Sequence, residues 1–158
     1  MSWFDGLFKP MPFLDAIRAG KAGDVQKHLK AGVDPNRKTD GERAWPLHYA
    51  VHARPEMVAL LIRSGAKVNV KDDGGKTPLH LAALSGYVGV VKLLVEAGAE
   101  LNATDKFGHT PLFDAAADVS PYEMIYSATG ATPSQRALQE QSGRGAVIGL
   151  LKSRGAVS

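Results

Sequence analysis

The sequence predicts an all-α solenoid of stacked helix-turn-helix units, because three features recur along it at one common spacing. Thr77-Pro78-Leu79 returns as Thr110-Pro111-Leu112. Single glycines and asparagines share this spacing: Gly32, Gly65 and Gly98, and Asn36, Asn69 and Asn102. A fixed period of 33 residues indicates repeating structural units. One unit cannot bury its apolar face alone, so the units are expected to stack.

The third unit, 70–102, shows the expected elements most regularly. Thr77 is placed to cap a helix N-terminus, with Pro78 at the first helical position, where its missing N–H costs nothing. An apolar stripe follows at helical spacing, and Gly86 ends the helix. A second, more apolar helix covers 90–95 and ends at Gly98. Turn-forming residues at 69–75 predict a hairpin-like turn between neighbouring units.

The first two units depart from this pattern. The first, 13–36, lacks the Thr-Pro opening, and its second helix, 24–30, carries polar residues where the third unit has Val and Leu. Those residues, Gln26, Lys27 and His28, are typical of a solvent-facing end unit. The second unit, 37–69, opens with Trp45-Pro46-Leu47-His48 and has Ala53-Arg54-Pro55-Glu56 in place of the glycine between its helices.

The fourth unit, 103–156, contains an insertion. Its closing Gly155 lies further from Gly98 than one period, and the excess places about 24 extra residues at 119–142, between its two helices. Ser120-Pro121 and Thr132-Pro133 predict short helices near 121–127 and 133–142. The final helix, 146–152, carries few polar residues, so we expect the insertion to be ordered and to cover it with Tyr122, Met124, Ile125, Tyr126 and Leu138. A partner or a second copy of the chain is the alternative cover.

The 33-residue period with Thr-Pro-Leu-His-x-Ala at 77–82 resembles the ankyrin repeat family. Matching positions run from about Phe13 to Ala156, which defines a repeat domain at 13–158 after an apolar N-terminal segment at 1–12. The resemblance implies an ankyrin-repeat solenoid whose histidines, His48 and His80, tie neighbouring turns by hydrogen bonds. It also implies a protein-interaction module that binds on its concave side. Four units exceed the number normally needed to fold without a partner.

Composition limits the possible functions. The 158 residues include no cysteine, which excludes disulfides, thiol catalysis and cysteine-bound zinc, and the formal charge of +3 does not demand nucleic acid. No apolar run is long enough to cross a membrane, and the N-terminus lacks the pattern of a secretory signal. We therefore expect a cytoplasmic protein with no nucleic-acid partner and no membrane span.

No motif points to catalysis or to a cofactor. Gly75-Lys76-Thr77 resembles the end of a phosphate-binding loop, but Val70 stands where that loop needs glycine. His48 and His52 have a spacing that can bind a metal, yet no carboxylate at helical spacing completes the set. Glu123 and Glu140 have no paired acid or base. We expect no metal, no cofactor and no enzymatic activity.

The family resemblance implies partner contacts at the turn tips and on the exposed faces of the first helices. In the second unit the positions are Arg37, Lys38, Glu42 and Arg43. In the third they are Lys71, Asp73, Lys76, Leu84 and Ser85. In the fourth they are Thr104, Lys106, Phe107, His109 and Asp118. Their basic bias predicts an acidic surface on the protein partner.

Two segments outside the repeat pattern are candidates for secondary contacts, through Trp3, Phe4, Leu7, Phe8, Tyr122 and Tyr126. For the N-terminal residues the competing interpretation is that they fold back onto the first unit. We predict a non-catalytic adaptor. The alternative is a dedicated inhibitor, immunity-type or accessory subunit of a single enzyme, with the insertion or the N-terminal segment providing specificity.

Overall fold

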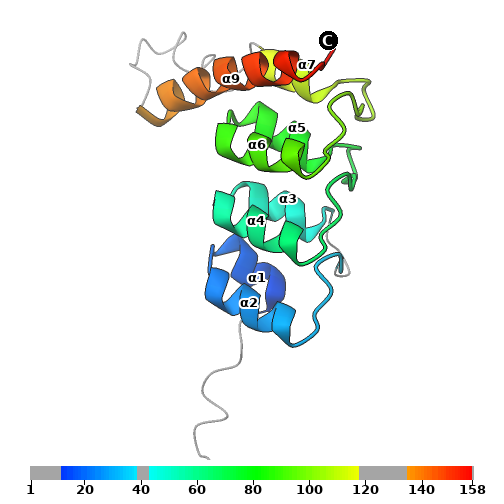
Figure 1. Cartoon of the computed structure of the whole chain (residues 1–158), viewed down its shortest axis with the longest axis vertical. Helices are drawn as coiled ribbons and strands as arrows, with labels where there is room; N and C mark the ends of the chain where they lie inside the picture. The colour runs from blue at the N-terminus through cyan, green and yellow to red at the C-terminus, as the bar shows by residue number, and fades with distance from the viewer. Residues whose placement is uncertain (1–11, 39–42, 118–134, 158) are drawn as a thin grey trace, which may run out of the picture.

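The computed structural model describes residues 12–38, 43–117 and 135–157, and in these residues it contains helices and no strand. The helices form four stacked layers, joined by turns along one side of the stack (Figure 1). Their order is α1 (Phe13–Arg18), α2 (Ala22–Lys30), α3 (Pro46–Val51), α4 (Pro55–Arg63), α5 (Pro78–Leu84), α6 (Val88–Glu96), α7 (Pro111–Ala116) and α9 (Gln135–Ser153). The predicted all-α repeat solenoid is confirmed.

The core runs continuously through all four layers. Each layer contributes large side chains that are almost fully buried: Ile17 and Val25, Leu47 and Leu61, Leu79 and Leu94, and Val147 and Leu151. Burying one such side chain stabilises the folded chain by about 1.5–3 kcal/mol. Because the helices of each layer pack against those of the next, the stability of each unit depends on its neighbours.

The Thr-Pro-Leu-His segment joins one unit to the next through its histidine. The backbone N–H of Thr77 donates to Nδ1 of His80 at 3.0 Å, and Nε2 of the same ring lies 3.0 Å from the carbonyl oxygen of His109 in the next turn. His48 makes the corresponding contacts, with the N–H of Trp45 at 3.3 Å and the carbonyl of Lys76 at 2.9 Å. The expected role of the two histidines is confirmed.

The periodic asparagines form a second set of links between units. Oδ1 of Asn36 accepts the N–H of Lys67, Oδ1 of Asn69 accepts the N–H of Glu100, and Oδ1 of Asn102 accepts the N–H of Val157, all at 2.8–2.9 Å. The amide groups of Asn36 and Asn69 also donate to the carbonyls of Gly65 and Gly98, at the ends of α4 and α6. Each asparagine therefore fixes the end of the following unit's second helix.

The buried histidines make the stability depend on pH. Burial lowers the pKa of both His48 and His80 from the usual 6.5, despite opposing contributions from the backbone carbonyls that they contact. Protonation at Nδ1 would also remove the hydrogen-bond acceptor for the backbone N–H of Trp45 or Thr77. Because the unfolded chain binds these protons more readily, the free energy of unfolding should fall as pH drops below about 6.5.

Urea unfolding measured from pH 8 to pH 5 checks this expectation. The midpoint should be nearly constant above pH 7 and should decrease below pH 6.5. Burial lowers the pKa of His52 as well, so three rings contribute to the decrease. In a His48→Gln variant the decrease should be smaller, since one of these rings is absent. An equal decrease in that variant would contradict the assignment.

The last helix differs from the prediction. The sequence suggested separate helices at 133–142 and 146–152, but α9 is one helix of 19 residues that passes through Gly143, Gly145 and Gly149. In Figure 1 it crosses the end of the stack above α5 and α6. Its backbone at Gly143 lies directly on the carbonyl of Gly86, in the turn between α5 and α6. Nε of Arg144 donates to the carbonyl of Leu84 at 2.7 Å, and this bond anchors the crossing.

From residue 143 onward, α9 exposes no large apolar side chain. Val147 and Leu151 point into the core, whereas Ile148 and Leu150 are half-buried. Within α9, the exposed positions from 143 onward hold small or polar residues, namely Gly145, Ala146, Gly149, Lys152 and Ser153. The side chains expected to cover this helix, Tyr122, Met124, Ile125, Tyr126 and Leu138, lie outside the described side chains, so cover by the insertion stays a prediction.

Candidate partner-binding site

Most of the predicted partner contacts lie on the turns between units, which follow one another along one side of the stack (Figure 1). In each of two turns an aspartate shapes the loop, because Oδ1 of Asp72 accepts the N–H groups of Gly74 and Lys76, and Oδ1 of Asp105 accepts those of Phe107 and His109, at 2.8–2.9 Å. The turns are also joined to each other. The N–H of Lys106 donates to the carbonyl of Gly74 at 3.0 Å. We call residues 71–76 and 104–109, with Arg37, Lys38 and Arg43, the turn row.

Several lysines of the turn row are already engaged within the protein. Nζ of Lys38 lies 3.1 Å from a carboxylate oxygen of Asp73, and Nζ of Lys71 donates to the carbonyl of Thr104 at 2.8 Å. Lys71 keeps its charge unneutralised, because its acceptor is uncharged. Lys106 is exposed and contacts no acid among the described residues. The excess positive charge of the row is therefore smaller than the residue types suggest.

Lys76 belongs to a partly buried charge cluster. Its Nζ lies 2.6 Å from Oδ2 of Asp114, on α7, and 3.1 Å from Oδ2 of Asp105, whose side chain is fully buried. Burial alone would lower the pKa of Lys76, but the two carboxylates outweigh it and raise the pKa. Burial opposes ionisation of Asp105 too, yet the N–H groups of His109 and Phe107, with Lys76, hold its pKa at about 2. Both residues therefore stay charged at neutral pH.

The cluster also contains the only described group of side chains with the geometry of a metal site. Asp105, His109 and Asp114 offer ligand atoms within 4.8 Å of one another. Lys76 lies close to both carboxylates and supplies a cation from within the protein. The arrangement links the third unit to the fourth through charge.

An aromatic patch lies beside this cluster, at the last turn of the row. The ring of His109 stacks on that of Phe113, with centroids 4.1 Å apart and an interplanar angle of 13°, and lies 6.0 Å from that of Phe107. Phe107 is 79% exposed and Phe113 is 46% exposed. A polar tip would be the ordinary choice for a turn, so two exposed phenylalanines beside a histidine form a candidate contact surface. We call Phe107, His109 and Phe113 the aromatic patch.

Phe107 and His109 were predicted from the sequence, but Phe113 was not. Phe113 holds the place of His80 in the repeat, one period later along the chain. His80 is buried because the following turn covers it, whereas Phe113 is partly exposed on α7. The change from Thr-Pro-Leu-His to Thr-Pro-Leu-Phe was the signal that could have revealed it.

The remaining predicted contacts are dispersed. Arg37, Arg43 and Thr104 are exposed in the turn row, whereas Leu84 and Ser85 are half-buried at the end of α5. The carbonyl of Leu84 accepts from Arg144, so α9 already occupies part of that face. Glu42, Asp118 and all the secondary positions, Trp3, Phe4, Leu7, Phe8, Tyr122 and Tyr126, lie outside the described residues.

These features define a helical repeat protein: stacked helix pairs, histidine and asparagine links between units, and a row of hydrogen-bonded turns. A model of ankyrin repeats, in three copies, matches residues 13–105. The chain belongs to the ankyrin repeat family. In the described part of the chain, no helix is both long enough and apolar enough to cross a membrane.

Relatives with known names share only part of their length with this chain. It is 38% identical over 65 residues to an ankyrin repeat-containing protein of Schizosaccharomyces pombe, covering 40% of this chain and 31% of that protein. It is 37% identical over 81 residues to protein phosphatase 1 regulatory subunit 27 of Mus musculus, covering 48% and 49%. For the phosphocholine transferase AnkX of Legionella pneumophila the identity is 33% over 69 residues, covering 43% of this chain and 7% of AnkX. The chain thus spans half or less of each.

Proposed function

We propose that this protein is a non-catalytic adaptor that binds a protein partner through the aromatic patch and the neighbouring cations of the turn row. The observation that carries the proposal is the exposure of Phe107 and Phe113 beside the stacked His109. Aromatic side chains are enriched at protein interfaces, and the few residues that carry most of the binding energy cluster near the centre of the contact. The patch gives such a centre at one end of the row.

The charges around the patch favour an acidic partner. Lys106 is adjacent to Phe107 in the chain, and Lys71 extends toward the same turn through its bond with Thr104. Lys76 cannot contribute in the same way, because Asp105 and Asp114 neutralise it. We therefore assign the electrostatic part of binding to Lys71 and Lys106, which should accelerate association at low ionic strength.

Affinity capture followed by quantitative mass spectrometry tests the proposal. A partner captured by the wild-type protein should be lost, or bound about ten-fold or more weakly, by a Phe107→Ala/Phe113→Ala variant, since truncating interface aromatics usually costs more than about 1 kcal/mol. A Lys71→Glu/Lys106→Glu variant should bind more slowly and with less dependence on salt. Lys30→Glu/Lys92→Glu, which changes exposed lysines of α2 and α6, is the matched control. Equal loss in that control would contradict the assigned surface.

A dedicated accessory subunit is the second candidate function. It is favoured by the similarity to a protein phosphatase 1 regulatory subunit, of which this chain matches about half. The same capture experiment separates the two functions. One partner in stoichiometric amount supports a dedicated subunit, whereas several partners that all depend on the aromatic patch support an adaptor.

A further inference from the structure

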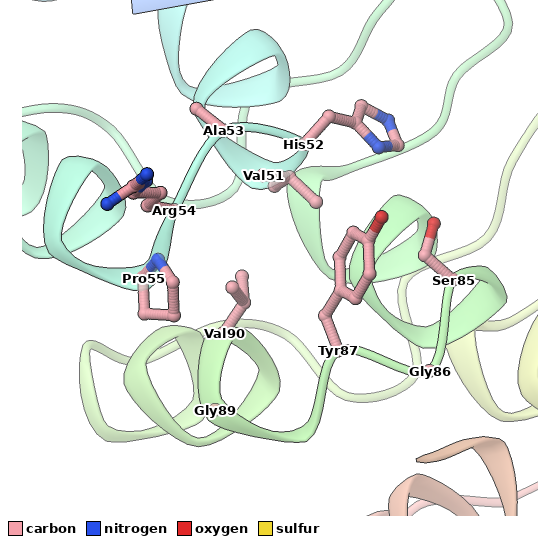
Figure 2. A pocket seen from close by; sticks show the side chains of 10 residues that line it. All are labelled: Val51, His52, Ala53, Arg54, Pro55, Ser85, Gly86, Tyr87, Gly89 and Val90. Carbon is pink, nitrogen blue, oxygen red and sulfur yellow. The ribbon is translucent and has the colours of Figure 1, made fainter. Parts of the chain in front are cut away.

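A groove lies between the helix-to-helix turns of the second and third units, away from the turn row. Its volume is about 650 Å³. That is within the roughly 300–1,000 Å³ typical of ligand sites. Figure 2 shows Val51, Pro55 and Val90 around its apolar part, with Tyr87 directed toward His52. The rings of His52 and Tyr87 meet edge to face, with centroids 6.1 Å apart.

The groove exists because the second unit turns differently from its neighbours. In the first and third units the turn contains a glycine with positive φ, Gly20 or Gly86. The next N–H then donates back to the preceding helix, as the N–H of Tyr87 does to the carbonyl of Ala82 at 3.0 Å. The second unit has Ala53 instead, and Arg54 is fully extended, with φ −153° and ψ 152°. The turn between α3 and α4 therefore diverges from the turn between α5 and α6.

The groove is also wider on the α6 side, because residue 89 is a glycine. Gly89 is exposed on α6, and a Cβ atom there would lie 3.8 Å from Cγ of Pro55, which is an ordinary contact. The corresponding position of the second unit is Glu56, and that of the first unit is Gly23. The absence of a side chain at 89 thus leaves the space above Pro55 open.

The groove offers hydrogen-bond donors and no acidic side chain. Arg54 is the fixed cation of its lining, and no aspartate or glutamate is among the lining residues. The backbone N–H of Arg54 and the hydroxyl groups of Ser85 and Tyr87 have no hydrogen-bond partner among the described residues. In Figure 2 the guanidinium of Arg54 lies at the Pro55 end of the groove, and the hydroxyl groups of Ser85 and Tyr87 lie at the opposite end. A guanidinium at one end of an apolar floor is complementary to a carboxylate next to an aliphatic side chain.

We propose that this groove binds a short extended peptide segment of a second protein, with an acidic side chain at Arg54 and an apolar neighbour against Val51, Pro55 and Val90. The site is separate from the aromatic patch. Two independent sites on different sides of one rigid stack would allow the protein to hold two partners at once. The proposal does not depend on the function assigned to the turn row.

Residue-resolved NMR titration with a capped Leu-Glu-Leu-Glu-Leu peptide tests the site. The amide signals of Gly86, Tyr87 and Gly89 should shift in a saturable manner. A peptide with glutamine in place of glutamate, or an Arg54→Ala variant, should bind at least ten-fold more weakly. A Phe107→Ala/Phe113→Ala variant should bind the peptide normally, which separates this result from any failure of the proposed function.

A matched pair of glycine substitutions makes the test specific. Gly89→Leu places a side chain in the groove and should abolish the shifts, while removing a helix glycine should not lower stability. Gly23→Leu makes the same change at the equivalent open position of the first unit and should leave binding intact. Binding retained in Gly89→Leu, equal affinity for the glutamine peptide, or shifts confined to the turn row would overturn the proposal. Preference for inorganic phosphate over the peptide would overturn it as well, by assigning a small anion.

Discussion

Replacing Lys76 by glutamate is expected to destabilise the folded protein by about 3–5 kcal/mol, the usual cost of leaving a buried charge uncompensated. The substitution would bring a third carboxylate beside Asp105 and Asp114, which are close enough to offer ligand atoms within 4.8 Å of each other. A loss of this size is a large fraction of the stability of a small domain. Urea unfolding followed by circular dichroism measures it.

Lys106→Glu is the control for this prediction. Lys106 is exposed in the equivalent region of the next turn and contacts no acid among the described residues, so its reversal should change stability by no more than about 0.5 kcal/mol. A Lys76→Met variant should lie between the two, and adding Asp114→Asn to it should recover part of the loss. Equal stability of the Lys76 and Lys106 variants would show that the cluster contributes nothing.

The charge cluster shows a limit of reading contacts from the repeat pattern. The sequence analysis placed Lys76 among the partner contacts of the turn tips. In the structure Lys76 is half-buried and closes the turn, because its carbonyl accepts the N–H of Asp72 at 3.0 Å. Its two carboxylate partners, Asp105 and Asp114, lie in the next turn and on α7, both in the following unit. The pattern predicts which positions are equivalent, but it does not say which side chains of successive units meet. A reversal that includes Lys76 would therefore disturb the fold and confuse a binding test.

The repeat pattern predicted the scaffold well for a physical reason. Positions one period apart face the same neighbours in successive units, so the same residue is needed each time. His48 and His80 contact successive turns, and the three periodic asparagines bond to successive helix ends. The aromatic patch was only partly predicted, because Phe113 breaks the pattern instead of repeating it.

The long last helix was not predicted. Gly143 and Gly145 lie between the two helices that the sequence predicted, 133–142 and 146–152, and each glycine lowers helix propensity by roughly 1 kcal/mol. The structure instead continues α9 through both glycines and through Gly149. Packing on α7, α5 and α6 stabilises it, and at Gly143 the missing side chain is what allows the backbones to meet. Tertiary contact here outweighs local preference.

Two glycines of α9, Gly143 and Gly149, are expected to have opposite effects on stability when replaced, because only Gly143 lies against another backbone segment. Gly143→Ala should destabilise the protein by about 1–3 kcal/mol, because its Cβ would collide with the backbone carbonyl of Gly86 and α9 would have to move away. Gly149→Ala should stabilise it by ~0.5–1 kcal/mol, since that position is open and alanine favours the helix. Thermal and urea unfolding of the two single variants give the comparison directly. A stabilising Gly143→Ala would mean that α9 does not rest on the turn between α5 and α6, and the hydrogen bond from Arg144 to Leu84 would then also have to be absent.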